Sequence, residues 1–281
     1  MAGSALTALD TLVRSNPPWL GAWRQRLALK AAAATVTLLR RTEDESVLRD
    51  GWALRRPGEA LGPAGAVHAA WHRLASRTVS LSLDELQTSA GHLGVPWPDT
   101  AGDLVAALAA ERRSGAPAPA IAARIGAAVM AETAHAEPLA WWLADLALSA
   151  RLGWSPAVPL LAGQMHARAL RVGPSGQRGR PGGEGFERVV CLAAAQGAAE
   201  ACRLAGEMAQ RAERLAAVQP KLRTKGAGEV VALLLSEDAV PGTYASPTLT
   251  RWASRRLFER LEQLGAVREL TGRTSFRLYG L

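Results

Sequence analysis

The sequence is poor in phenylalanine, tyrosine, cysteine and lysine. Three Phe and two Tyr stand among 281 residues, and alanine and leucine supply most of the 48% hydrophobic content. Strands are usually rich in aromatic and β-branched residues, whereas alanine and leucine favour helices. The composition therefore argues against a β-rich fold. It predicts an all-α protein with enough apolar content for one large domain or two ordinary ones.

Cysteine is too scarce for a disulfide or metal framework. Cys191 and Cys202 fall on one predicted helix, about three turns apart. At about 1.5 Å of rise per residue they lie roughly 16 Å from each other, too far for a disulfide. They are typical of small buried residues in a reducing cytoplasm.

Long apolar runs are also missing. No stretch reaches the roughly 18 residues that a membrane span needs. The first dozen residues include Asp10 in a mixed helix, without the uninterrupted apolar stretch of a signal peptide. We expect a cytoplasmic protein with no membrane partner.

Known catalytic motifs are not found. The sequence has no nucleophile elbow, redox cysteine pair or dinucleotide-binding fingerprint. His68 and His72 share a helical face, but no Glu follows the first as in zinc proteases, and no third ligand stands out. We therefore predict no catalytic residue, no metal and no cofactor. An enzyme would need a site assembled from scattered residues, which spacing cannot reveal.

Basic residues are what the sequence does have. The formal net charge is +8 and the isoelectric point is near 10.6, typical of proteins that bind nucleic acid or an anionic membrane surface. Lysine supplies only three of the 33 basic residues. The alternative is therefore that arginine usage in a GC-rich genome raises the isoelectric point without a function.

Glycine and proline separate a series of predicted helices. Asn16-Pro17-Pro18 begins a helix that runs through Leu38, and Thr42 to Glu45 fits a capping box for the next. Shorter helices are predicted near 100–113, 118–134, 138–152 and 156–171. The nine tryptophans are expected to anchor contacts between helices rather than to stack on bases. The pattern predicts a helical domain over 1–172 and a flexible Gly/Pro linker at 173–185.

A long helix is predicted from Phe186 to Val218, leading to a basic elbow that ends at residue 225. Its seam alternates steps of four and three, with small residues that allow close packing and with Arg211 breaking it. The seam residues are Val190, Ala194, Gly197, Ala201, Leu204, Met208, Leu215 and Val218. A central core helix and a homodimer formed through this helix both fit the pattern.

The last segment, 226–281, predicts a small winged-helix module. A helix over 226–238 and a second from about Thr248 or Thr250 to Gln263 precede a hairpin that turns at 271–274. In the hairpin, Phe276 and Leu278 alternate with Arg277. The segment from Pro241 to Pro247, where a positioning helix would lie, has a loop composition. This order makes the second helix the candidate reader of a DNA major groove.

Projection of the second helix gives mixed support for DNA reading. The predicted core stripe is Ala253, Leu257, Leu261 and Leu264. The opposite face carries Arg251, Arg255, Glu259 and Glu262, flanked by Arg256 and Trp252. Two carboxylates beside phosphates are unfavourable, although Glu can accept a hydrogen bond from cytosine. Phe258 lies off the stripe and needs cover from another element.

The elbow between the long helix and the module concentrates three cations, which suit contacts to phosphates or a solvated hinge. The candidate DNA contacts are Lys221, Arg223, Lys225, Arg251, Arg255, Arg256, Arg273 and Arg277. The leading hypothesis is a non-enzymatic protein that binds double-stranded DNA through these residues. The alternative is an interaction or scaffold protein whose module packs on the long helix and binds no DNA.

Several stretches together resemble one family. They are Trp23–Ala34, Arg41–Glu45, Leu48–Asp50, Arg56–Gly58 with Gly62–Gly65, Pro220–Gly228, and Leu264–Arg273 running to Phe276–Leu281. They resemble the bacterial family called domain of unknown function 1403, whose members are often plasmid-encoded. The likeness spans nearly the whole chain and is loosest over about 80–185. It implies no catalytic residues, because the family has no established activity.

The C-terminal end alone is also similar to the winged helix appended to Fic-type adenylyltransferases and to other plasmid-borne helix-turn-helix proteins. The Fic active-site run of His, Pro, Phe and Asp-Gly-Asn-Gly-Arg occurs nowhere in the chain. This second resemblance therefore implies a winged helix-turn-helix and no adenylyltransferase activity.

Overall fold

Helices make up most of the chain, as its alanine and leucine content predicts. The computed structural model describes residues 2–56, 58–78, 82–97, 102, 105–106, 109–111, 114–132, 135–174 and 176–281. Its α-helices are α1 (Ala2–Ser15), α2 (Leu20–Leu38), α3 (Glu45–Ala53), α4 (Pro63–Ser76), α5 (Leu83–His92), α7 (Ala118–Glu132), α8 (Glu137–Leu152), α9 (Phe186–Val218), α10 (Ala227–Ser236) and α11 (Arg251–Gln263). The helix predicted near 100–113 falls mostly outside the described residues.

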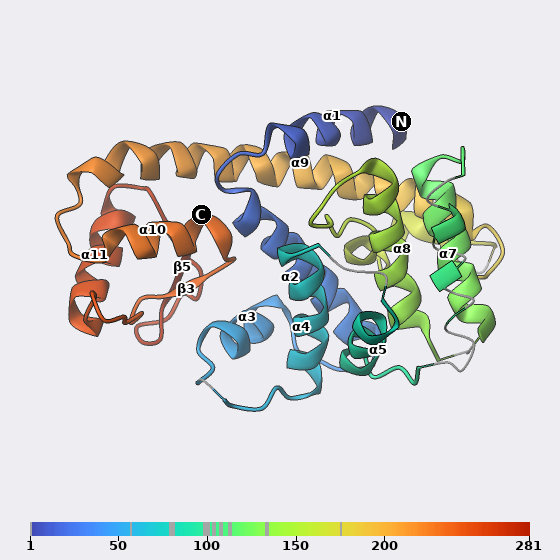
Figure 1. The fold of residues 1–281 in the computed structure, drawn as a ribbon, viewed down its shortest axis with the longest axis horizontal. Coiled ribbons are helices and arrows are strands. Elements are labelled where there is room, and N and C mark those ends of the chain that lie inside the picture. The colour runs from blue at the N-terminus through green and yellow to red at the C-terminus, as the bar shows by residue number, and fades with distance from the viewer. Residues whose placement is uncertain are drawn as a thin grey trace.

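Helices α1 to α8 form a helical body around α2. Figure 1 shows α9 running along this body with α1 beside it, α7 and α8 at one end and the C-terminal elements at the other. Tryptophan side chains join the helices, as predicted. The indole of Trp23 donates to the carbonyl of Ala201 at 2.9 Å, and that of Trp142 donates to Ala70 at 3.2 Å.

The long helix is a core helix of the chain. Its start and end match the prediction, and seam residues such as Val190, Ala201 and Met208 are buried against the chain's own helices. A Cβ on Gly197 would lie 2.5 Å from the carbonyl oxygen of Leu160, so this glycine permits the close packing that the seam predicts. A homodimer through α9 would have to use the opposite, exposed side of the helix.

Two local predictions are wrong. Helix α3 is capped by Asp44, whose carboxylate accepts from Val47 N at 3.0 Å, so the cap lies two residues after the predicted cap, Thr42. The helix predicted at 156–171 is replaced by two 3₁₀ turns, Ala162–Gln164 and Arg168–Leu170. Pro156 and Pro159 lack the amide hydrogens that a continuous helix would use.

The Gly/Pro segment 173–185 is held against the body. Part of it forms a short antiparallel hairpin, in which β1 (Arg171–Val172) pairs with β2 (Gln177–Arg178). The guanidinium groups of Arg178 and Arg180 both pair with the buried carboxylate of Glu137 on α8. These contacts anchor the segment that the sequence predicts to be a flexible linker.

The C-terminal module, residues 226–281, combines two helices with a small sheet. Strand β3 (Val240–Pro241) follows α10, while β4 (Arg268–Glu269) and β5 (Leu278–Gly280) follow α11. The sheet is antiparallel in the order β3-β5-β4. Thr250 caps α11 by accepting from Ala253 N at 3.2 Å. Residues 242–250 form turns, as the composition of that loop predicts.

Buried ion pairs fasten the module to the body. The carboxylate of Asp238, which follows α10, pairs with Arg26 of α2 and with Arg49 of α3. Arg26 also donates to the carbonyl of Leu281 at 3.0 Å. Burial alone would raise the pKa of Asp238, but the charges and hydrogen bonds of the two arginines outweigh it and lower that pKa. Asp238 and the chain end at Leu281 thus both contact the body.

Candidate nucleic-acid interface

The orientation of α11 differs from the projected one. Ser254, Leu257, Phe258 and Leu261 are buried, whereas Leu264 is 40% exposed and Ala253 only partly buried. The ring of Phe258 stacks on Tyr279 of β5, with centroids 4.7 Å apart. Because Tyr279 covers Phe258, the buried face of the helix is rotated by about 50° from the predicted stripe. This is half of the roughly 100° that separates successive residues.

The rotation changes which side chains face solvent. Trp252, Arg256, Glu259 and Gln263 now lie opposite the buried stripe, with Arg255 and Arg260 on either flank. Arg251 and Glu262, predicted near the centre of the reading face, move toward its edge. With its flanks, the outward face therefore holds three arginines and one carboxylate, whereas the predicted face with its flanks has three arginines and two carboxylates.

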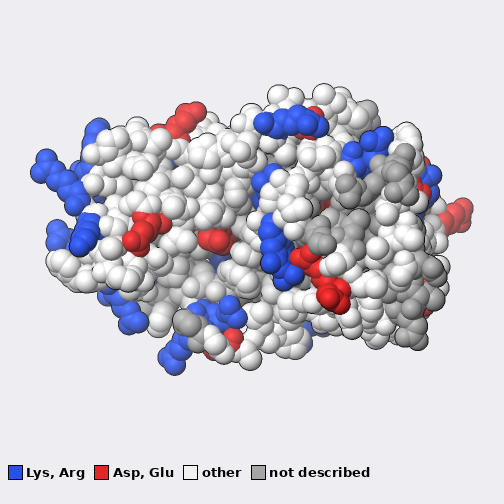
Figure 2. Space-filling model, viewed as in Figure 1, with Lys and Arg blue, Asp and Glu red and all other residues white. Residues whose placement is uncertain are grey.

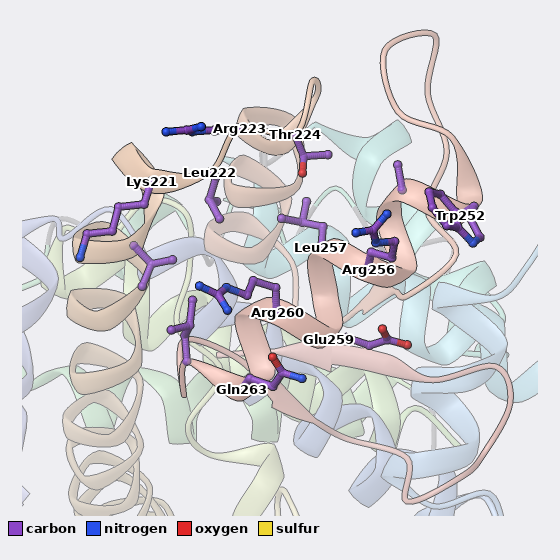
Figure 3. A pocket seen from close by; sticks show the side chains of 13 residues that line it. Lys221, Leu222, Arg223, Thr224, Trp252, Arg256, Leu257, Glu259, Arg260 and Gln263 are labelled. Carbon is purple, nitrogen blue, oxygen red and sulfur yellow. The ribbon is translucent and has the colours of Figure 1, made fainter.

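A groove of about 680 Å³ separates α11 from the elbow, residues 219–225, which begins with the 3₁₀ turn Gln219–Lys221. We call it the elbow groove. Four cations line it: Lys221 and Arg223 from the elbow, and Arg256 and Arg260 from α11. Figure 3 shows the Arg260 guanidinium pointing from α11 toward the end of α9. The floor is apolar and includes Leu222, Leu257 and Leu264, together with Val218 and Ala253.

A second hollow, the wing hollow, lies on the other flank of α11. It has a volume of about 360 Å³ between the helix and the β4–β5 loop. Arg255 and Arg277 line it together with Thr274, Ser275 and Phe276. Phe276 was expected to point inward from a strand, but it lies in the loop with φ +53° and is 69% exposed.

The eight candidate DNA contacts are all exposed, but the structure divides them. Lys221, Arg223 and Arg256 meet in the elbow groove, and Arg255 and Arg277 meet in the wing hollow. Lys225 and Arg251 line neither of these two spaces. Arg273 is held in a two-pronged pair with Asp50 of α3, at 2.7 and 2.8 Å. Its charge is thus matched within the chain.

The groove cations differ from the arginines of the body. In the body and at the junction Arg26, Arg49 and Arg178, for example, form salt bridges. Within the described part of the chain, Lys221, Arg223 and Arg260 form no salt bridge, and Arg256 lies over the Trp252 ring at 4.7 Å from its centroid. Figure 2 shows basic side chains projecting from the end of the molecule that holds the module.

Four of the six acidic residues of the same segment make contacts within the chain. Residues 219–281 carry ten basic and six acidic side chains. Asp238 and Glu237 contact the body, Glu229 accepts from Thr248, and Glu269 caps the turn at Thr271. Two of the six acidic residues, Glu259 and Glu262, are thus exposed beside the cations of α11.

The two spaced histidines belong to the junction between body and module. The Nε2 atom of His72 lies 3.1 Å from Glu237, and Trp52 packs on both imidazoles with centroids 4.4 and 5.1 Å away. The cavity beside them is about 10 Å³, too small for a substrate. In the described residues no three potential ligands converge as a metal site requires. Within the same residues, no helix combines the length and apolar character that crossing a membrane would need.

His68 should make stability depend on pH. Burial, assisted by the nearby His72, lowers its pKa to about 4 from an ordinary 6.5. Between these values the unfolded chain binds a proton that the folded chain does not, so the free energy of unfolding falls as the pH falls. The expected loss from this group between pH 7.5 and 5 is about 2 kcal/mol.

Urea denaturation of wild type and His68→Gln at both pH values measures this loss. Burial raises the pKa of Asp145 to about 6, so that carboxyl acts in the opposite sense between about 4 and 6. Asp145 contributes equally to the pH dependence of both proteins. The quantity to compare is therefore the change in the free energy of unfolding between the two pH values, wild type against His68→Gln. Equal changes with pH in both would contradict the assignment to His68.

The fold and the site define a mainly helical protein with a basic groove between α11 and the elbow. Residues 1–281 match the family described as protein of unknown function (DUF1403), and the chain belongs to that family. A search of curated proteins finds no match to it.

Proposed function

We propose that this protein binds double-stranded DNA through its C-terminal module. In this proposal α11 enters the major groove, and the elbow contacts the sugar-phosphate backbone. The observation that carries it is the set of cations without carboxylate partners, among the described residues, around the elbow groove. Such cations gain by contacting phosphates, because binding releases counterions from the DNA. This role goes with a cytoplasmic location.

The order of elements supports the same reading. The module runs α10, β3, α11, β4, β5, and β5 lies between the other two strands. This order matches that of a winged helix-turn-helix that lacks its positioning helix. In that fold, the helix before the hairpin reads the major groove. We propose the winged helix on this topology.

The outward face of α11 offers suitable groups for reading bases. An arginine such as Arg256 can donate two hydrogen bonds to guanine, and Gln263 can pair with adenine. Glu259 can accept from the amino group of cytosine. Arg255 and Arg277, which line the wing hollow together with Glu259, can contact a phosphate. Arg273 could contribute only after its pair with Asp50 opens.

Fluorescence anisotropy with a labelled duplex tests the proposal. The variant replaces Lys221, Arg223, Arg256 and Arg260 with alanine. The control removes the same number of charges at the exposed arginines Arg56, Arg168, Arg188 and Arg203, which form no salt bridge in the described part of the chain. The groove variant should bind roughly 100-fold more weakly, and its slope of log affinity against log salt should shrink by about 3.

The control should change affinity by less than about threefold, since its charges lie on the body and on α9, outside the elbow groove. Circular dichroism of both variants checks that they remain folded. No binding of the wild type at low salt would sink the proposal. Equal losses in the groove variant and the control would also contradict it, because they would reflect net charge alone.

A protein partner is the second candidate, and the apolar floor of the elbow groove favours it. This candidate expects the module to pack on the long helix and to bury Phe258 and the Arg251–Arg255 face. Phe258 is buried, but its cover is Tyr279 of the module itself, and Arg251 and Arg255 are exposed. These positions support DNA binding over the scaffold role.

A further inference from the structure

Trp252 is an unusual side chain for this protein. Within the described residues, Trp252 and Phe276 are the aromatic side chains that are mostly exposed, and Trp252 is 67% exposed. The other tryptophans that join helices, such as Trp23 and Trp142, are fully buried. The Trp252 ring lines the elbow groove beside Arg256. The core of the fold therefore does not account for its position.

The lining of the elbow groove combines two kinds of surface. Its cations suit phosphates. The sugar-phosphate backbone of a duplex, however, offers no flat apolar surface to contact the floor of Leu222, Leu257 and Leu264 or an exposed indole. An unpaired nucleotide offers both a phosphate and a base with flat, apolar faces. Aromatic side chains in a positively charged groove are the usual means of holding single-stranded nucleic acid.

We infer that the elbow groove holds an unpaired nucleotide whose base stacks on Trp252. This inference rests on the proposed function and narrows it to DNA in which a duplex adjoins unpaired bases. Arg256, one helical turn from Trp252, and Arg260, one turn further, hold the phosphate. Glu259 is the carboxylate in the lining, and it accepts from an exocyclic amino group. The volume of about 680 Å³ lies in the range of sites for small molecules.

The test compares two labelled DNA molecules in anisotropy titrations of the full chain. One is a continuous duplex of about 20 base pairs, a length of roughly two helical turns. The other has the same ends and length but a central tract of unpaired cytosines, whose exocyclic amino groups can donate to Glu259. The wild type should bind the second molecule at least about fivefold more tightly, the lower limit for stacking of one base.

Three variants assign the preference to the groove. Trp252→Ala should bind both molecules equally. Trp252→Phe should keep most of the preference, because a smaller ring still stacks. Phe276→Ala is the matched control, since it removes an equally exposed ring from the wing hollow, and should leave the preference unchanged.

The possible outcomes separate this inference from the proposed function. Equal binding of both molecules by the wild type overturns the inference and leaves duplex binding intact. A preference that survives in Trp252→Ala, or disappears in Phe276→Ala, also overturns it. If the wild type binds neither molecule, both the inference and the proposed function fail.

Discussion

Replacing Asp238 with alanine is expected to destabilise the protein by about 3–5 kcal/mol. The carboxylate lies between Arg26 and Arg49, and the three side chains are between 11% and 15% exposed. Without it, two guanidinium groups remain in a region of low polarity with no opposite charge. Urea denaturation followed by circular dichroism measures the free energy of unfolding.

The loss should be accompanied by loosening of the module. Because Asp238 joins α10 to α2 and α3, hydrogen exchange in residues 226–281 should accelerate more than exchange in α7 and α8. Glu43→Ala is the control, since it removes a more exposed pair with Arg41 and should cost less than about 1 kcal/mol. Similar losses in the two variants would show that Asp238 does not hold the junction.

Replacing Asp145 with alanine is expected to cost about 4 kcal/mol or more. This side chain of α8 is fully buried, and its two oxygens accept the backbone N–H groups of Leu160, Leu161 and Ala162 at 2.8, 2.8 and 3.0 Å. Alanine leaves three buried donors unsatisfied, each at a cost of roughly 1–3 kcal/mol. Thermal and urea denaturation both measure the effect.

Two further variants grade this effect. Asp145→Asn keeps an acceptor oxygen but turns an amide N–H toward a backbone donor, so it should cost less than alanine. Ser149→Ala removes one acceptor, the hydroxyl that accepts a hydrogen bond from Val158 N at 3.1 Å. It should lower the free energy of unfolding by about 1–2 kcal/mol. If Asp145→Ala proves no more costly than Ser149→Ala, Asp145 is not the main anchor of this segment.

Local signals explain which parts of the fold the sequence could predict. The limits of α9 follow from the glycines before Phe186 and the proline after Val218, and Thr250 marks the start of α11. Pro156 and Pro159 are a local signal against a helix over 156–171, but the path that this segment takes instead could not be predicted in the same way. It depends on Asp145, whose carboxylate takes the backbone donors of a segment that lies on the far side of a turn.

Contacts over long distances in the sequence also decided the site. The face of α11 depends on Phe258 finding cover from Tyr279, which belongs to a strand that follows the helix. The sequence missed Arg260 and Gln263 for this reason, although the spacing of Arg256 and Arg260 by four residues is a signal for one shared face. The sequence predicts that Arg273 is available to contact DNA, because its partner, Asp50, is far away in the sequence and no local pattern indicates the pair.

Because the module is attached to the body, α9 fixes the distance between the module and the far end of the body. With 33 residues and a rise of about 1.5 Å per residue, the helix is about 50 Å long. It runs from the α7 end of the body to the elbow, and Arg26 and Arg49 fix the module at that end (Figure 1). The axis of any DNA held by α11 would therefore have a fixed orientation relative to the body. Probes attached near the two ends of α9 should report one separation instead of a broad distribution.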